Sequence, residues 1–122
     1  MTALHIEGCT VAFGGLRAID DVTLDVPGNT ITALIGPNGS GKSTFVNMVS
    51  GQIPPSRGRI LLHGEPITGM RSDQIVHRGL ARTYQVPKVP KELTIEEVIS
   101  VPLLYARSNR ALPRGLRTAA DV

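Results

Sequence analysis

The feature that most constrains this chain is a glycine-rich segment at residues 36–43, which reads GPNGSGKS. It matches the pattern G-x-x-x-x-G-K-S/T at every specified position. Its glycines allow the backbone to curl closely, so that successive amide N–H groups point inward toward an anion. The segment therefore predicts a loop that cradles phosphates, made by Gly36, Pro37, Asn38, Gly39, Ser40, Gly41, Lys42 and Ser43.

The segments on either side of this loop have the patterns that a phosphate loop needs. Residues 30–35, TITALI, are mostly apolar without alternation, which is typical of a strand covered on both faces in a parallel sheet. After Lys42 the apolar residues recur at helical spacing, and Gly51 is expected to end the helix. We therefore expect a buried strand, then the loop, then a helix.

This arrangement predicts a separate task for each of three side chains. Lys42 reaches the β- and γ-phosphates of a nucleotide as a cation, and the Ser43 hydroxyl binds a Mg²⁺ that bridges them. Thr44 adds a hydroxyl near the α-phosphate, and the positive end of the helix attracts the same anion. The alternative, a Gly/Ser-rich turn with an unrelated lysine, is disfavoured by the strand and helix patterns on either side. The motif alone does not say which class of NTPase this is.

The rest of the chain predicts a mixture of strands and helices. Strands are expected at residues 5–13, 18–26, 59–63 and 80–84, with a short helix around Ile75 and Val76 that stops at Gly79. Thr94 and Glu97 form the capping box of a further helix, which Pro102 is expected to kink or end. Antiparallel strands followed by strand, loop and helix indicate an α/β fold.

Composition excludes several classes of protein. The single cysteine excludes a disulfide framework and argues against a thiolate zinc site. The net charge of +3 comes from the arginines of residues 106–122, so it is poor support for a nucleic-acid partner. No apolar run approaches the ~20 residues that span a bilayer, and the N-terminus lacks a secretory signal pattern. An intracellular protein, soluble or peripheral, is expected, with Cys9 in the core and no metal-ligand spacing among His5, His63 and His77.

Three features beyond the loop carry a resemblance to a known family. Phe13 stands in Ala12-Phe13-Gly14-Gly15, Gln85 stands in Ala81-Arg82-Thr83-Tyr84-Gln85, and residues 94–98 read TIEEV. Together with the loop, they resemble the N-terminal part of the ATP-binding subunit of ABC transporters over residues 4–106. The stretches FGGLRAIDDV, IGPNGSGKST and LARTYQ are most similar to ATPases of branched-chain amino acid importers and of the related urea and amide importers.

The resemblance implies roles that the residue pattern alone does not assign. It implies ATP and Mg²⁺ as cofactors, with Phe13 stacked on adenine and Gln85 in contact with Mg²⁺, the attacking water and the membrane partner. By the residues alone, Phe13 could equally close a strand, and Gln85 could be a solvated surface residue. The resemblance also implies a P-loop NTPase core with an antiparallel β subdomain in residues 1–84. The helical subdomain would start in residues 85–106, and an Arg-rich tail would follow in residues 107–122.

The family's later motifs do not occur in this sequence: the signature helix start, the Walker B strand ending in Asp-Glu, the D-loop and the switch histidine. Because the Walker B glutamate polarises the attacking water in the family, we expect ATP binding with feeble or no hydrolysis, and we assign no catalytic residue. We also expect an incomplete portion of a longer ATPase, in which the strand at residues 30–35 lacks a neighbour.

The leading hypothesis is the ATP-binding portion of a transporter ATPase on the inner face of the cell membrane. Its implied partners are ATP, integral-membrane permease subunits and a second ATPase subunit, with no nucleic acid. Two alternatives stay open: a P-loop protein of another class, such as a soluble ABC-type repair or translation factor, and a non-catalytic remnant that binds nucleotide. The transported solute, an amino acid or a urea or amide, is selected by other subunits in the family.

Overall fold

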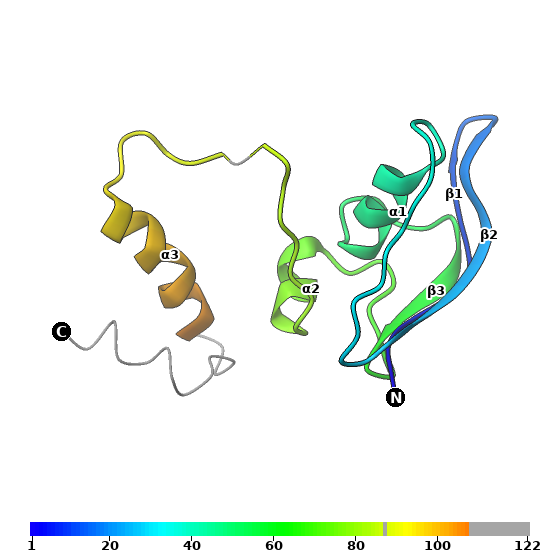
Figure 1. The fold of residues 1–122 in the computed structure, drawn as a ribbon, viewed down its shortest axis with the longest axis horizontal. Coiled ribbons are helices and arrows are strands. Elements are labelled where there is room, and N and C mark those ends of the chain that lie inside the picture. Colours follow the sequence, from blue (N-terminus) through cyan, green and yellow to red (C-terminus); the bar gives the residue numbers. More distant parts are fainter. Residues whose placement is uncertain (87, 108–122) are drawn as a thin grey trace. The chain divides into compact units, whose positions relative to one another are not determined.

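The computed structural model describes residues 1–86 and 88–107 of the chain. Its contacts divide the chain into two compact units, Met1–Ala81 and Arg82–Val122. The first unit holds an antiparallel sheet and two helices, and the second holds the helix α3 (Figure 1). Within the described residues, no helix combines the length and the apolar character needed to cross a membrane.

The sheet of the first unit consists of a long hairpin extended by two shorter strands. Strands β1 (Thr2–Phe13) and β2 (Leu16–Pro27) pair antiparallel around the turn at residues 14–15, and Phe13 faces Leu16 at the end of the hairpin. Strands β3 (Arg57–Leu62) and β4 (Glu65–Pro66) complete the order β2-β1-β3-β4. The strands predicted at residues 5–13, 18–26 and 59–63 are therefore confirmed, with bounds that differ at their ends.

The core lies between one face of this sheet and two helices, α1 (Lys42–Val49) and α2 (Ser72–His77). Met48 of α1 is only 2% exposed, and Ile75 of α2 is also buried. Gly51 and Gly79 follow these helices with positive φ, as their positions at helix ends predict. The buried set comprises Ile6, Cys9, Val11, Ile19, Met48, Val49, Ile60, Leu62, Ile67 and Ile75. The prediction that Cys9 is a small core residue is thus confirmed, and its burial raises the pKa of the thiol.

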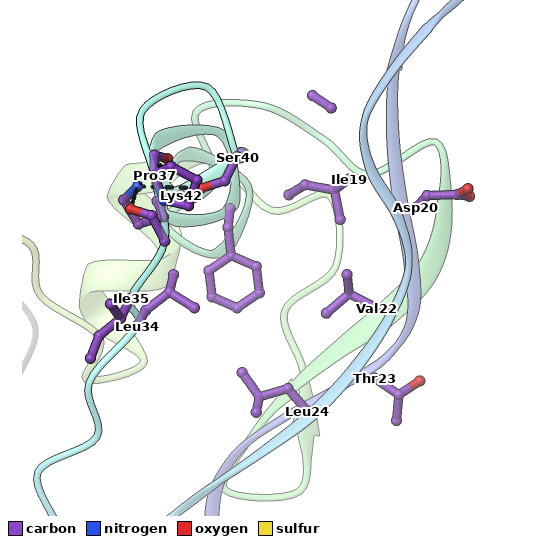
Figure 2. A pocket seen from close by; sticks show the side chains of 14 residues that line it. Ile19, Asp20, Val22, Thr23, Leu24, Leu34, Ile35, Pro37, Ser40 and Lys42 are labelled. Atoms are coloured by element: carbon purple, nitrogen blue, oxygen red, sulfur yellow. Dashed lines mark hydrogen bonds between the residues drawn. The ribbon is translucent and has the colours of Figure 1, made fainter.

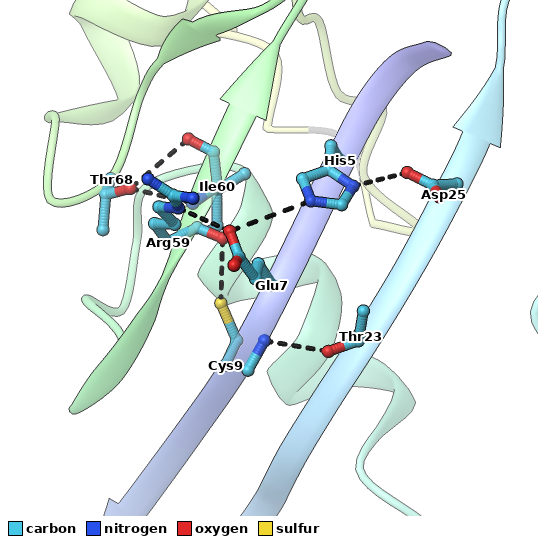
Figure 3. A network of polar contacts seen from close by, with 9 residues as sticks. His5, Glu7, Cys9, Thr23, Asp25, Arg59, Ile60 and Thr68 are labelled. Carbon is cyan, nitrogen blue, oxygen red and sulfur yellow. Dashed lines mark hydrogen bonds and ion pairs between the residues drawn. The ribbon is translucent and has the colours of Figure 1, made fainter.

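Polar side chains cross three strands of the same sheet (Figure 3). The Nε of Arg59 on β3 donates to Glu7 of β1 at 2.5 Å, and His5 Nδ1 lies 2.5 Å from Asp25 Oδ1 of β2. The hydrogen bond from Arg59 holds the pKa of the Glu7 carboxyl below its usual value. His5 is therefore part of a cross-strand ladder. The described residues form no cluster of three or more His, Cys, Asp or Glu side chains suited to a metal ion.

Two predicted strands do not form. Residues 30–37 and 80–84 have no regular secondary structure, and Ile31 is 102% and Ile35 90% exposed. A strand buried on both faces needs hydrogen-bonding neighbours, and none of the strands in the described residues pairs with residues 30–35 or 80–84. The predictions of strands at these two places are wrong for this structure.

The second unit begins its helix where the capping box predicts. The Thr94 N–H donates to Glu97 Oε2 at 2.7 Å, and the Glu97 N–H donates to Thr94 Oγ1 at 3.3 Å. The helix α3 (Ile95–Arg107) continues past Pro102, so this proline does not end it. The tail predicted after this point lies, from residue 108 on, outside the described residues.

Candidate nucleotide-phosphate site

The glycine-rich loop curls back on itself and runs directly into α1. Gly39 and Gly41 adopt φ of 83° and 97°, a left-handed region that glycine enters without steric cost. The Ser40 N–H donates to the Pro37 carbonyl at 3.2 Å, which closes the turn. Gly41 is the N-cap of α1, and no side chain caps that end. The first amides of α1 therefore face the loop without a side-chain acceptor, as an anion site requires.

Two of the glycines make close contacts, and at Gly41 the backbone angle also favours glycine. A Cβ at Gly41 would lie 2.5 Å from the Ala18 carbonyl oxygen of β2. A Cβ at Gly36 would lie 2.7 Å from Ser40 Oγ across the curl. The loop is therefore pressed against β2 at Gly41 and closed tightly between Gly36 and Ser40.

The ammonium of Lys42 lies inside the curl. Its Nζ donates to the carbonyl of Gly36, to the carbonyl of Pro37 at 2.7 Å and to Ser40 Oγ at 3.3 Å (Figure 2). The cationic ammonium is held there by neutral carbonyl and hydroxyl groups. This charge and the uncapped start of α1 favour a phosphate group at the same place.

Two cavities adjoin the loop. One, of about 530 Å³, is mainly apolar and lies between β2 and the residues before the loop, with Val22, Leu24, Leu34, Ile35 and Phe45 in its wall (Figure 2). The other, of about 330 Å³, lies over the start of α1 between the loop and the end of the hairpin. Its lining comprises Leu16, Arg17, Ala18, Asn38, Gly39, Gly41, Lys42, Ser43 and Thr44. This second cavity collects both hydroxyls that the sequence predicts to serve a nucleotide, Ser43 and Thr44.

The predicted site residues thus fall into three groups. Residues 36–44 are brought together around the loop. Phe13 lies at the end of the hairpin with 51% of its surface exposed, opposite Leu16, which does line the second cavity. Gln85 belongs to the other unit, where it is exposed in a bend. The roles assigned to these residues, including a Mg²⁺ site at Ser43 and Gln85, stay predictions.

Sequence reasoning missed the contribution of β2 to the site. Arg17 and Ala18 lie far from the loop in sequence, and no motif marks them. Their place beside residues 38–44 follows only from the fold: Gly41 packs on the Ala18 carbonyl, and Arg17 lines the same cavity as the loop. The one available signal was their place just after Phe13, in a stretch that resembles the ABC ATPases.

Comparison with known proteins agrees with this geometry. The profile of a family described as ABC transporter matches residues 19–120. The probable branched-chain amino acid transport ATP-binding protein LivG of Methanocaldococcus jannaschii is 37% identical over 97 residues, which is 80% of this chain and 38% of the relative. The high-affinity branched-chain amino acid transport ATP-binding protein BraF of Pseudomonas aeruginosa is 40% identical over 98 residues, with the same shares.

Solved structures of ATP-binding cassettes are also similar to this chain. A nucleotide-free ATP-binding cassette from an ABC transporter is similar with a TM-score of 0.75 and 32% identity, over 93% of this chain and 48% of that one. The ADP conformation of an ATP-binding cassette is similar with a TM-score of 0.73 and 32% identity, over the same shares. The chain spans 38% of the length of the curated relatives it matches. With its phosphate loop and α/β fold, this chain belongs to the ABC transporter family of ATP-binding domains.

Proposed function

We propose that this chain binds ATP with Mg²⁺ as part of an ATP-binding subunit that energises the import of a small solute. The observation that carries the proposal is the Lys42 ammonium inside a glycine curl that opens onto the uncapped start of α1. Backbone amides and a fixed cation favour a polyphosphate over less charged ligands. Ser43 and Thr44, both in the wall of the adjoining cavity, supply hydroxyls for Mg²⁺ and for the α-phosphate.

The proposal extends to the two residues that lie away from the loop. Phe13 supplies an exposed aromatic ring for adenine, and stacking on a base is worth roughly 1–3 kcal/mol. Gln85 serves Mg²⁺ and the contact with a membrane subunit. We assign no catalytic base among the described residues. We therefore expect ATP hydrolysis by this chain alone to be feeble or absent.

The transport role rests on the relatives. Because the relatives named above are branched-chain amino acid transport proteins, an amino acid is the favoured solute class, with a urea or amide as the second choice. The partners in this role are integral-membrane permease subunits and a second ATPase subunit. The chain would then work at the inner face of the cell membrane, as a peripheral protein.

Calorimetric titration of the folded chain with Mg-ATP tests the binding step. Removing the ammonium in Lys42→Ala loses a charge-assisted contact and should weaken binding about tenfold to a hundredfold. Lys91→Ala, which removes an exposed lysine from the other unit, is the matched control and should bind as the unaltered chain does. Equal affinity of the Lys42 and Lys91 variants, with both folded, would contradict the assignment of the phosphate cradle.

A further inference from the structure

Among the residues that the structure describes, Arg17 and Lys42 are the two cationic residues that line the cavity over the start of α1. Arg17 precedes Ala18 in β2. A Cβ added to Gly41 would lie only 2.5 Å from the Ala18 carbonyl oxygen. The backbone at Arg17 is therefore held against the loop. Thr44, the hydroxyl predicted to lie near the α-phosphate, lines the same cavity.

The guanidinium of Arg17 has a partner that it can exchange. Its Nη1 donates to Asp20 Oδ1 at 3.0 Å, and the two side chains are 62% and 57% exposed. An ion pair so exposed contributes little to stability, so breaking it costs little. A phosphate competes well for the guanidinium, because its oxygens match the planar fork of donors and carry more charge than a carboxylate.

We propose that Arg17 is a nucleotide-binding residue, which leaves Asp20 when nucleotide binds and donates to the α-phosphate from the β2 side of the cavity. This inference rests on the proposed function, because it needs a nucleotide in the loop. Lys42 acts on the β- and γ-phosphates and Arg17 on a phosphate that ATP and ADP share. Asp20 then regulates affinity as a competitor for the guanidinium.

Calorimetric titration of Mg-ATP and Mg-ADP into the full chain separates these roles. Arg17→Gln should weaken both nucleotides by the same factor, about three- to tenfold, and the loss should shrink at high salt. Asp20→Asn should tighten both by about two- to fivefold in the unaltered chain, because the guanidinium loses its competitor. The same Asp20→Asn change should have no such effect when Arg17→Gln is already present.

The control is Arg78→Gln, which removes the same charge from an exposed arginine that does not line the cavity. It should bind both nucleotides like the unaltered chain, and urea unfolding confirms that each variant is folded. If Arg17→Gln equals Arg78→Gln while Lys42→Ala loses binding, the role of Arg17 is overturned and the proposed function stands. Additive effects of Asp20→Asn and Arg17→Gln would also overturn it. If the folded, unaltered chain binds no Mg-ATP, the proposed function fails and the inference fails with it.

Discussion

Residues 30–35 and residues 36–43 are consecutive in the chain, yet only the second segment has the structure that its residue pattern predicts. The loop curls because Gly39 and Gly41 take positive φ and because Lys42 binds carbonyls only a few residues away. A strand, in contrast, depends on partners from distant parts of the chain. In the described residues no strand pairs with residues 30–35, and their apolar side chains are exposed. A local pattern is thus sufficient for the loop and insufficient for the strand.

The largest expected effect on stability is at α1, the helix that follows the loop, and we compare it with the exposed segment before the loop. Met48 of α1 is almost fully buried, so Met48→Ala should lower the free energy of unfolding by about 2–5 kcal/mol. Ile31→Ala removes an apolar side chain at a fully exposed position and should change the free energy of unfolding by no more than about 0.5 kcal/mol. Urea denaturation measures both. A large loss of unfolding free energy in Ile31→Ala would mean that residues 30–35 pair with a strand in solution. That result would contradict the difference drawn between this segment and the loop.

The next prediction tests the glycine-rich loop, the segment whose structure follows from its own residue pattern. Gly41→Ala places a side chain at a positive φ and against the Ala18 carbonyl, and should cost about 1–3 kcal/mol of unfolding free energy. Gly14→Ala is the control, because Gly14 also has a positive φ but a Cβ there meets nothing within 4 Å. We expect Gly41→Ala to cost more and to weaken Mg-ATP binding as well. Equal costs for the two variants would show that β2 does not press on the loop.

The sequence predicts best what neighbouring residues determine. The loop at 36–43, the capping box of Thr94 and Glu97 and the two helix ends at Gly51 and Gly79 all follow from short-range patterns. The hairpin strands were also predictable, because alternation and the glycines at 14–15 mark them. The failures at 30–35 and 80–84 and the unpredicted place of Arg17 in the cavity wall share one cause. In each case the local structure or the site depends on which distant segment of the backbone lies next to these residues. No pattern of neighbouring residues carries that information.

The smallest expected effect concerns the polar ladder on the sheet that carries the loop. The hydrogen bond from Arg59 lowers the pKa of Glu7 from its ordinary value of 4.5 in the folded chain. The pair therefore stabilises the fold at pH above 4.5, and this contribution is lost as the pH falls through the lowered pKa. Because both side chains are exposed, the change should be slight.

Urea denaturation of Glu7→Gln between pH 7 and pH 3 measures this contribution. The variant should be slightly less stable than the unaltered chain at neutral pH and nearly equal to it at the acid end. Glu65→Gln, at an exposed position on β4, is the control. A stability difference for Glu7→Gln that grows toward low pH has the wrong sign and would contradict the ladder.

The most direct test of the account is a titration of the ¹⁵N-labelled chain with Mg-ATP, followed through the backbone amide resonances. If the curl around Lys42 holds the triphosphate, the amides of residues 39–44 should show the largest shifts, and those of residues 30–33 should change little. Largest shifts elsewhere, with residues 39–44 unmoved at saturating nucleotide, would contradict the account.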